Sequence, residues 1–192
     1  MLAALADPYR TDKNTWHSYL DLYQSLLEKR RESAKNVLEI GIHRGGSIKM
    51  WYDFFPNAVI HALDILHINE IWSEIQHKNR ICLYTSMDAY NEEIFRRTFL
   101  EKNIKCDFLI DDGPHTLETQ KEFIRLYSQL MTEDGILIIE DIQSPDWLLE
   151  LVSHTPEYLK PYIMIYDLRS IKGRYDDIVF TIDKTKTPNQ MT

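Results

Sequence analysis

The stretch that decides the fold is Val37-Leu38-Glu39-Ile40-Gly41-Ile42-His43-Arg44-Gly45-Gly46-Ser47. Its first half is an apolar run of the kind found in buried strands. Glycines follow at the point where the chain turns into a segment with helical spacing, and they allow the backbone to approach a ligand closely. The stretch therefore predicts a strand, a ligand-binding loop and a helix, in that order.

Outside this unit, strand and helix patterns alternate along the chain. We expect strands at 36–42, 59–65, 81–85, 108–111, 135–140, 162–168 and 178–182, and helices at 14–30, 47–55, 91–102, 117–131 and 146–153. Thr11 or Asp12 could cap the first helix. Strands joined through helices imply right-handed crossovers and a parallel sheet. The last two strands have a turn at Lys172-Gly173-Arg174 and no helix between them, which predicts an antiparallel hairpin. The expected fold class is α/β, a doubly wound, mostly parallel sheet with a reversed edge element.

Length and composition indicate one globular domain. We assign residues 1–192 to a single domain, with the N-terminal helix at 14–30, a core at 36–183 and a polar tail at 184–192. The net charge of −8 argues against nucleic acid as a partner, because phosphate binding needs a basic surface. We find no membrane span and no signal peptide, and we interpret Cys82 and Cys106 as reduced core residues. A cytoplasmic location is the expectation.

The glycine loop favours S-adenosylmethionine over a dinucleotide. The spacing Gly41-x-x-x-Gly45 differs from that of a pyrophosphate loop, and Glu39 would repel a pyrophosphate while attracting a sulfonium or amino group. Asp64 ends the second strand about 20 residues further on, where an acid can hold a ribose diol. An ordinary tight turn is the alternative, and Asp88 could be a helix cap instead of a contact to adenine. The residues we assign to the cofactor here are Glu39, Gly41, Gly45, Ser47, Asp64, Asp88 and Asp111.

Carboxylates also gather at the ends of two later strands. One strand ends in Asp111 and Asp112, and the next ends in Glu140 and Asp141. If these strands are adjacent and parallel, the four acids repel one another unless a cation lies among them. Oxygen ligands without cysteine suit Mg²⁺, Mn²⁺ or Ca²⁺. His115 lies close enough to meet a bound substrate, although the acids and the histidine could also be helix caps.

At this point the sequence resembles the sugar O-methyltransferases of macrolide biosynthesis, the macrocin and mycinamicin type. The similarity runs from about Thr11 to Ile182. It is carried by Thr11-Asp12-Lys13, Trp16-His17-Ser18-Tyr19, Leu38-Glu39-Ile40-Gly41, Arg44-Gly45-Gly46-Ser47, Ile110-Asp111-Asp112-Gly113-Pro114-His115-Thr116 and Ile139-Glu140-Asp141-Ile142.

The resemblance implies a Rossmann-like methyltransferase fold and a metal-assisted reaction. It implies that Asp112, Glu140 and Asp141 bind Mg²⁺ or a similar hard divalent cation, that His115 is the general base, and that the acceptor is a sugar hydroxyl. Pro114 stands where the family usually has serine. We also expect no additional N-terminal domain and no long lid insertion.

The N-terminal helix could close over the site and bring Lys13, His17 and Tyr19 to the cofactor or the acceptor. Tyr19 could equally be a packing residue. Methylation of a catechol or another small phenol is an alternative reaction, and a non-catalytic cofactor-binding subunit is an alternative role. The expected partners are a small-molecule or glycan acceptor and, because the site needs cover from water, a second copy in a possible homodimer.

Overall fold

The computed structural model describes residues 1–188, which form a seven-stranded sheet in the order β3-β2-β1-β4-β5-β7-β6. Residues 189–192 of the predicted polar tail lie outside the described residues. The strands are β1 (Asn36–Ile40), β2 (Val59–Leu63), β3 (Ile81–Tyr84), β4 (Cys106–Asp111), β5 (Met131–Ile139), β6 (Ile163–Asp167) and β7 (Ile178–Asp183). The first five are parallel, and the strand order reverses between β1 and β4. A doubly wound sheet binds ligands beyond its carboxyl ends at such a reversal.

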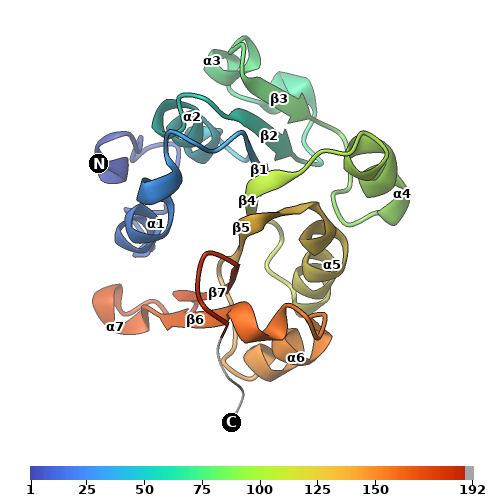
Figure 1. The fold of residues 1–192 in the computed structure, drawn as a ribbon. Coiled ribbons are helices and arrows are strands. Elements are labelled where there is room, and N and C mark those ends of the chain that lie inside the picture. The colour runs from blue at the N-terminus through green and yellow to red at the C-terminus, as the bar shows by residue number, and fades with distance from the viewer. Residues whose placement is uncertain (189–192) are drawn as a thin grey trace.

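Helices cover both faces of the sheet (Figure 1). They are α1 (Tyr19–Leu27), α2 (Gly46–Phe54), α3 (Ser73–Gln76), α4 (Glu92–Phe95), α5 (Leu117–Tyr127), α6 (Trp147–His154) and α7 (Arg169–Lys172). Among the described residues, none of these helices is long and apolar enough to cross a membrane.

Successive side chains along each strand point alternately into two separate hydrophobic cores, one on each face of the sheet. Val37 and Phe108 belong to the core that α1 and α2 cover, which includes Trp51 of α2. Leu38 and Leu109 belong to the core on the other face, which α4, α5 and α6 cover. The alternation follows from the two-residue period of a strand. It also decides where each acid at a strand end points: Glu39 lies on the α1 and α2 side of the sheet.

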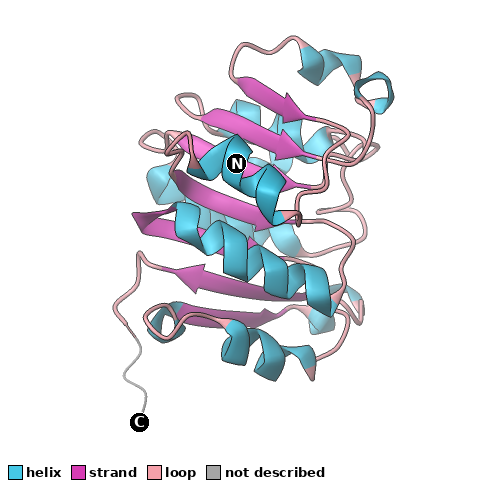
Figure 2. Cartoon of the chain, turned by 90° about the vertical axis from the view of Figure 1, so that its right-hand side faces the viewer, coloured by secondary structure: helices cyan, strands magenta, loops and turns pink. Residues whose placement is uncertain are grey.

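The reversed strand does not lie where the sequence predicted it. The antiparallel pairing of the last two strands is confirmed, but β7 also pairs antiparallel with β5, so β6 is the edge strand (Figure 2). The burial of the two strands explains this order. All six residues of β7 are buried, whereas Ile165 of β6 is 43% exposed. A one-turn helix, α7, also lies in the connection, and Gly173 ends it at a φ of 74°.

The N-terminal helix is shorter than predicted. It begins at Tyr19 after Ser18, whose side chain makes no capping bond, so neither Thr11 nor Asp12 caps it. Residues 7–17 instead form a chain of turns in which the Asp12 carbonyl accepts the N–H groups of Thr15, Trp16 and His17 at 3.0 Å each. We call residues 7–17 the strap, because they cross the start of α2.

The remaining helix boundaries differ for local reasons. The helix predicted at 91–102 begins as α4 and continues as a π-helical segment over Arg96–Leu100. The helix predicted at 117–131 ends at Tyr127, because β5 already begins at Met131. Short 3₁₀ segments over Leu2–Ala4, Glu28–Arg30, Ile68–Glu70, Ser128–Leu130 and Lys160–Tyr162 complete the described chain.

Candidate active site

The loop after β1 touches two other segments through its glycines. A Cβ atom on Gly41, whose φ is 95°, would lie 2.0 Å from the carbonyl oxygen of Asp112. A Cβ atom on Gly46 would lie 2.6 Å from the carbonyl oxygen of Arg10 in the strap. Only glycine allows these approaches, so this loop holds the end of β4 on one side and the strap on the other.

Asp64, at the end of β2, fixes the same loop. Its Oδ2 accepts the N–H groups of Ile42 at 2.7 Å and His43 at 3.1 Å, and its Oδ1 accepts that of Leu66 at 3.0 Å. Asp64 also lines a cavity of about 460 Å³ at the carboxyl ends of β1, β2 and β4. We call this the cofactor cavity. Its wall comprises Ile40, Gly41, His43, Leu63, Asp64, Ile65, Leu66, Met87, Asp88, Ala89, Tyr90, Asp112, Gly113, Pro114 and Thr119.

Several residues predicted to contact the cofactor do not line this cavity, and their contact with the cofactor stays a prediction. Gly45, Ser47, Glu39 and Asp111 are not among the lining residues. Glu39 is completely buried, and its Oε2 accepts the indole N–H of Trp51 at 2.5 Å. Its Oε1 has no hydrogen-bond partner and lies 3.4 Å from Lys13 Nζ, so both oxygens face groups inside the protein. Asp111 accepts a hydrogen bond from the hydroxyl of Tyr90, which does line the cavity.

Burial changes the protonation of both of these acids. It raises the pKa of Asp111 to about 7, although the Tyr90 hydroxyl and His115 oppose the shift. Burial likewise raises the pKa of Glu39 to about 7, against the charge of Lys13. These two side chains support the wall through hydrogen bonds to Trp51 and Tyr90.

Lys13 of the strap is the cation that the carboxylates meet. Its Nζ lies 2.6 Å from Asp112 Oδ2, 2.6 Å from Glu140 Oε2 and 3.4 Å from Glu39 Oε1, and the side chain is 1% exposed. Burial alone would lower the pKa of Lys13, but the three carboxylates raise it well above its usual value. The ammonium is therefore charged, and it joins the ends of β1, β4 and β5. The sequence indicated for Lys13 only a contact to the cofactor or the acceptor.

Glu140 has both carboxylate oxygens engaged. Lys13 donates to Oε2, and the hydroxyl of Tyr23 on α1 donates to Oε1. Nothing in the sequence indicated a role for the hydroxyl of Tyr23, which lies within the helix predicted at 14–30. Its partner could be identified only once α1 was placed against the end of β5.

His115 faces the other two acids at the strand ends. Its Nε2 lies 3.2 Å from Asp112 Oδ1 and 3.3 Å from Asp141 Oδ2. His115 and Asp141 both have a φ of 52°, a left-handed conformation that is costly for residues other than glycine and is often retained at functional sites. Burial would lower the pKa of His115, but the hydrogen bond to Asp112 and the charges of Asp141 and Asp111 raise it.

His115 is not the cap of the helix that follows it. The N-cap of α5 is Thr116, whose hydroxyl accepts the N–H of Thr119 at 3.2 Å. The capping role considered for the histidine is thus filled by its neighbour, and the imidazole remains available at the strand ends.

Asp112, His115 and Asp141 could hold a metal ion. They offer one ligand atom each, and these atoms lie within 4.8 Å of one another. The two carboxylates suit a hard divalent cation such as Mg²⁺, whereas an imidazole suits softer metals, so Asp112 and Asp141 are the candidate ligands in this group and His115 lies beside them. The predicted ligands Asp112 and Asp141 are therefore brought together, whereas Glu140 points to Lys13 and Tyr23 instead. Its role as a metal ligand stays a prediction.

A second layer of polar groups surrounds Asp141. The Tyr19 hydroxyl donates to Asp141 Oδ1, and His17 Nδ1 lies 3.2 Å from that oxygen and 2.7 Å from Asp177 Oδ1. Asp176 and Asp177 were missed in the sequence, although a pair of acids directly before the last strand could have drawn attention. The strap and α1 thus reach the strand ends, as the sequence predicted for the N-terminal segment.

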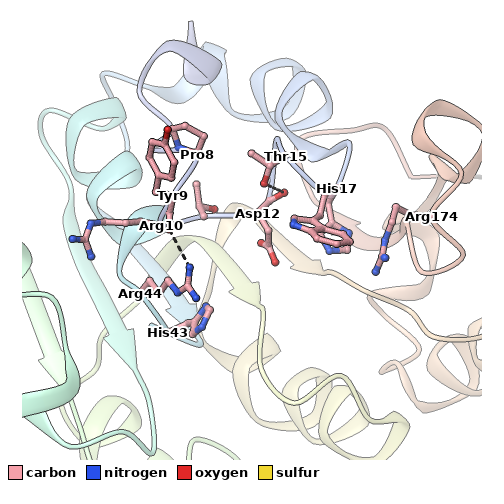
Figure 3. Close-up of a pocket in the computed structure, with 11 residues that line it drawn as sticks. Pro8, Tyr9, Arg10, Asp12, Thr15, His17, His43, Arg44 and Arg174 are labelled. Carbon is pink, nitrogen blue, oxygen red and sulfur yellow. Dashed lines mark hydrogen bonds between the residues drawn. The ribbon is translucent and has the colours of Figure 1, made fainter.

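A further cavity, of about 350 Å³, opens between the strap and the loop after β1 (Figure 3). Its wall comprises Pro8, Tyr9, Arg10, Thr11, Asp12, Thr15, Trp16, His17, His43, Arg44 and Arg174. His43 lines both cavities, and His17 connects this one to Asp141. The two cavities therefore flank the group of Asp112, His115 and Asp141.

The sequence is similar to curated sugar O-methyltransferases. No family model matches the sequence. The chain is 29% identical over 149 residues to the 8-demethyl-8-(2-methoxy-alpha-L-rhamnosyl)-tetracenomycin-C 3'-O-methyltransferase of Streptomyces olivaceus, covering 73% of this chain and 36% of that protein. It is 27% identical over 155 residues to the mycinamicin VI 2''-O-methyltransferase of Micromonospora griseorubida, covering 76% of this chain and 37% of that protein. The chain thus spans little more than a third of the length of these relatives, which are sugar O-methyltransferases.

Solved methyltransferase structures share the fold. The MycE methyltransferase of the mycinamycin pathway, in complex with Mg, SAH and mycinamycin VI, superposes with a TM-score of 0.74 at 22% identity, over 95% of this chain and 54% of that one. A putative caffeoyl-CoA O-methyltransferase from Staphylococcus aureus gives a TM-score of 0.56 at 18% identity, over 87% of this chain and 83% of that one. The predicted Rossmann-like methyltransferase fold and the resemblance to macrolide sugar O-methyltransferases are both confirmed.

Proposed function

We propose that this chain transfers a methyl group from S-adenosylmethionine to a hydroxyl of a sugar or glycoside, assisted by Mg²⁺ or a similar hard divalent cation. The observation that carries the proposal is the position of His115. Its imidazole lies between Asp112 and Asp141, at the strand ends between the two cavities. Asp112 lines the cofactor cavity and Asp141 contacts His17 of the other cavity, so an imidazole held by these two acids stands where an acceptor hydroxyl could meet the methyl donor.

The residues that line the cofactor cavity are suited to binding S-adenosylmethionine. Apolar side chains such as Leu63, Leu66 and Met87 offer surfaces for an adenine ring. Asp64 stands at the end of β2, where a carboxylate holds a ribose diol in doubly wound folds. Asp88, on the same wall, remains our candidate for a contact to adenine.

The chemistry that remains is activation of the acceptor hydroxyl. His115 accepts the proton as the hydroxyl oxygen attacks the methyl carbon, and the thioether leaves with the electron pair of the broken carbon–sulfur bond. Asp112 and Asp141 orient the imidazole and stabilise its charge after the transfer. A divalent cation held by Asp112, Asp141 and a third group would lower the pKa of a coordinated hydroxyl.

Binding of the cofactor tests the first half of the proposal. We expect S-adenosylhomocysteine to bind in isothermal titration calorimetry, and Asp64→Ala to weaken that binding by about tenfold or more, because a charged hydrogen-bond partner is lost. Asp53→Ala is a matched control, since that aspartate pairs with Lys49 on α2 and does not line the cofactor cavity. Equal affinities for wild type and Asp64→Ala would show that the ribose is held elsewhere.

Metal removal tests the second half. Exhaustive chelation should abolish turnover and leave S-adenosylhomocysteine binding intact, because the proposed metal ligands other than Asp112 lie outside the cofactor cavity. Added Mg²⁺ should restore the rate. Full turnover after chelation would contradict the metal role. Product mass spectrometry with glycosides and with catechols then separates the sugar acceptor from a phenol, and binding without any product would indicate a non-catalytic subunit.

The partners beyond the acceptor stay predictions. A small-molecule or glycan acceptor accords with the relatives, which are named for glycosylated small molecules. The possible homodimer can be checked by light scattering at assay concentration.

A further inference from the structure

The cavity between the strap and the loop after β1 is unusual for its charge. Three arginines, Arg10, Arg44 and Arg174, are among its lining residues, and Asp12 is the acid among them. The whole sequence carries a net charge of −8, so a site with an excess of positive charge runs against the composition. We call it the arginine cavity. Figure 3 shows His17 between Arg44 and Arg174 and His43 beside Arg44, whereas the guanidinium of Arg10 points away from the other two.

Of these three arginines, Arg44 is the one that has no carboxylate partner among residues 1–188. Its Nη1 donates to the carbonyl oxygen of Tyr9 at 3.3 Å. The side chain is exposed on the loop that also forms the cofactor cavity. A guanidinium has five N–H donors, so most of those on Arg44 remain available to a ligand.

The other two arginines are held in place and keep donors free. Arg10 stacks on the ring of Trp72 at 4.0 Å and lies 3.6 Å from a carboxylate oxygen of Asp7. Arg174 donates through Nη2 to Asp176 at 2.9 Å, while its buried Nε has no hydrogen-bond partner. Stacking and pairing fix the orientation of a long side chain, which reduces the entropy lost when a ligand binds.

The position of the arginine cavity connects it to the reaction. His43 forms part of its wall and part of the cofactor cavity's wall. At the other end, His17 lies 3.2 Å from Asp141, which also contacts His115. A molecule anchored among the arginines would therefore extend toward the imidazole.

We propose that the arginine cavity binds an anionic group of the acceptor, a phosphate or a carboxylate, so that the substrate is a charged sugar such as a sugar phosphate, a nucleotide-linked sugar or a uronic acid. This inference rests on the proposed methyl transfer, whose acceptor it narrows. Guanidinium groups match both anions, because they donate two parallel hydrogen bonds to a planar carboxylate or to phosphate oxygens.

Inorganic phosphate and acetate are suitable probes. We expect inorganic phosphate to bind with a saturable isotherm to the protein saturated with S-adenosylhomocysteine, and also to the protein without it. Arg44→Gln and Arg174→Gln should each weaken that binding by about tenfold, because each removes a charge-assisted hydrogen bond. Arg97→Gln is the control, since Arg97 pairs with Glu93 on α4 and lies outside the cavity wall. Acetate binding with the same dependence on the arginines would identify a carboxylate as the bound group.

Three results would overturn the inference. One is that neither anion binds, and another is that the arginine variants bind phosphate as tightly as wild type. The third is that Arg44→Gln weakens S-adenosylhomocysteine while its affinity for 5'-methylthioadenosine is unchanged, because the carboxylate of the cofactor then occupies the cavity. If S-adenosylhomocysteine does not bind at all, methyl transfer fails, but phosphate binding to the protein alone still tests the arginines. Melting temperatures establish that each variant is folded.

Discussion

His115 takes a left-handed backbone conformation, and the next residue, Thr116, caps α5. Variants of these two neighbours therefore distinguish a catalytic role from a stabilising one. His115→Ala should lower kcat by about 10²- to 10⁴-fold, the usual contribution of a positioned base. Its affinity for S-adenosylhomocysteine should remain that of wild type, because His115 does not line the cofactor cavity. Steady-state kinetics and calorimetry on the same preparation measure both quantities.

Thr116→Ala is the matched control for that experiment. Removal of the N-cap hydroxyl should cost about 1 kcal/mol of unfolding free energy and leave kcat near that of wild type. If His115→Ala instead behaves like the cap variant, losing stability but retaining most of its turnover, the histidine is not the base.

For single residues, the sequence predicted which acids meet at the strand ends, but it did not predict which groups they contact. Parallel pairing of β4 with β5 brings the ends of both strands to one edge, so the meeting of Asp112 and Asp141 followed from the pattern. The contacts of Lys13 and Tyr23 did not follow, because they depend on how the strap and α1 dock against that edge. Periodicity defines which face of a helix is apolar and says nothing about the single hydroxyl that ends on a carboxylate.

The strap is the element whose placement depends most on one glycine. Gly46→Ala would put a Cβ atom 2.5 Å from the carbonyl carbon of Arg10, so the strap has to move away from α2. We expect a loss of roughly 1–3 kcal/mol of unfolding free energy, the usual cost of overpacking. Amide hydrogen exchange of residues 10–17 should become faster, because the strap loses its contact with the loop.

Gly173→Ala provides the comparison for the strap. Gly173 also has a positive φ, but a Cβ atom there would meet nothing within 4 Å. This variant should lose about 1 kcal/mol through backbone strain alone and keep the slow exchange of the strap. Equal exchange rates in Gly46→Ala and wild type would mean that the strap accommodates the methyl group without leaving.

Element order was readable from the sequence, and element boundaries less so. Alternation of strand and helix patterns predicted all seven strands and the parallel first five. The sequence did not predict that β7 lies between β5 and β6. A central strand differs from an edge strand only in having more apolar residues on both faces, and residues 162–168 and 178–182 both contain apolar runs. Residues 14–17 of the strap were mistaken for the start of the helix because Trp16 continues the helical spacing of Tyr19 and Tyr23, whereas their backbone bonds are turns around the Asp12 carbonyl.

For the molecule as a whole, His61 gives the stability a pH dependence. Burial, followed by the charge of Lys102, lowers the pKa of His61 from 6.5 to about 4 in the fold. As the pH falls below 6.5 the unfolded chain binds a proton that the folded chain excludes, so stability declines between about 6.5 and 4 and this contribution levels off below. At ~1.4 kcal/mol per pKa unit, the decline amounts to roughly 3 kcal/mol.

Denaturant unfolding at several pH values measures that decline. His61→Gln should show a shallower fall in unfolding free energy over the same range, because the titrating group is gone. His77→Gln is the control, since His77 is exposed at the end of α3, and it should follow the wild-type curve. Identical slopes for His61→Gln and wild type would assign the acid sensitivity to the carboxylates.

The ammonium of Lys13 also sets an order of events during synthesis on the ribosome. Lys13 is made 99 residues before Asp112 and 127 residues before Glu140. Burying the ammonium without these acids would leave a charge without a partner in an apolar environment, which is strongly unfavourable. The strap therefore has to wait in water while β1 to β4 are translated, and it docks only after β5 has left the exit tunnel. A nascent chain stalled before residue 140 should accordingly expose its first residues to a protease that the finished chain resists.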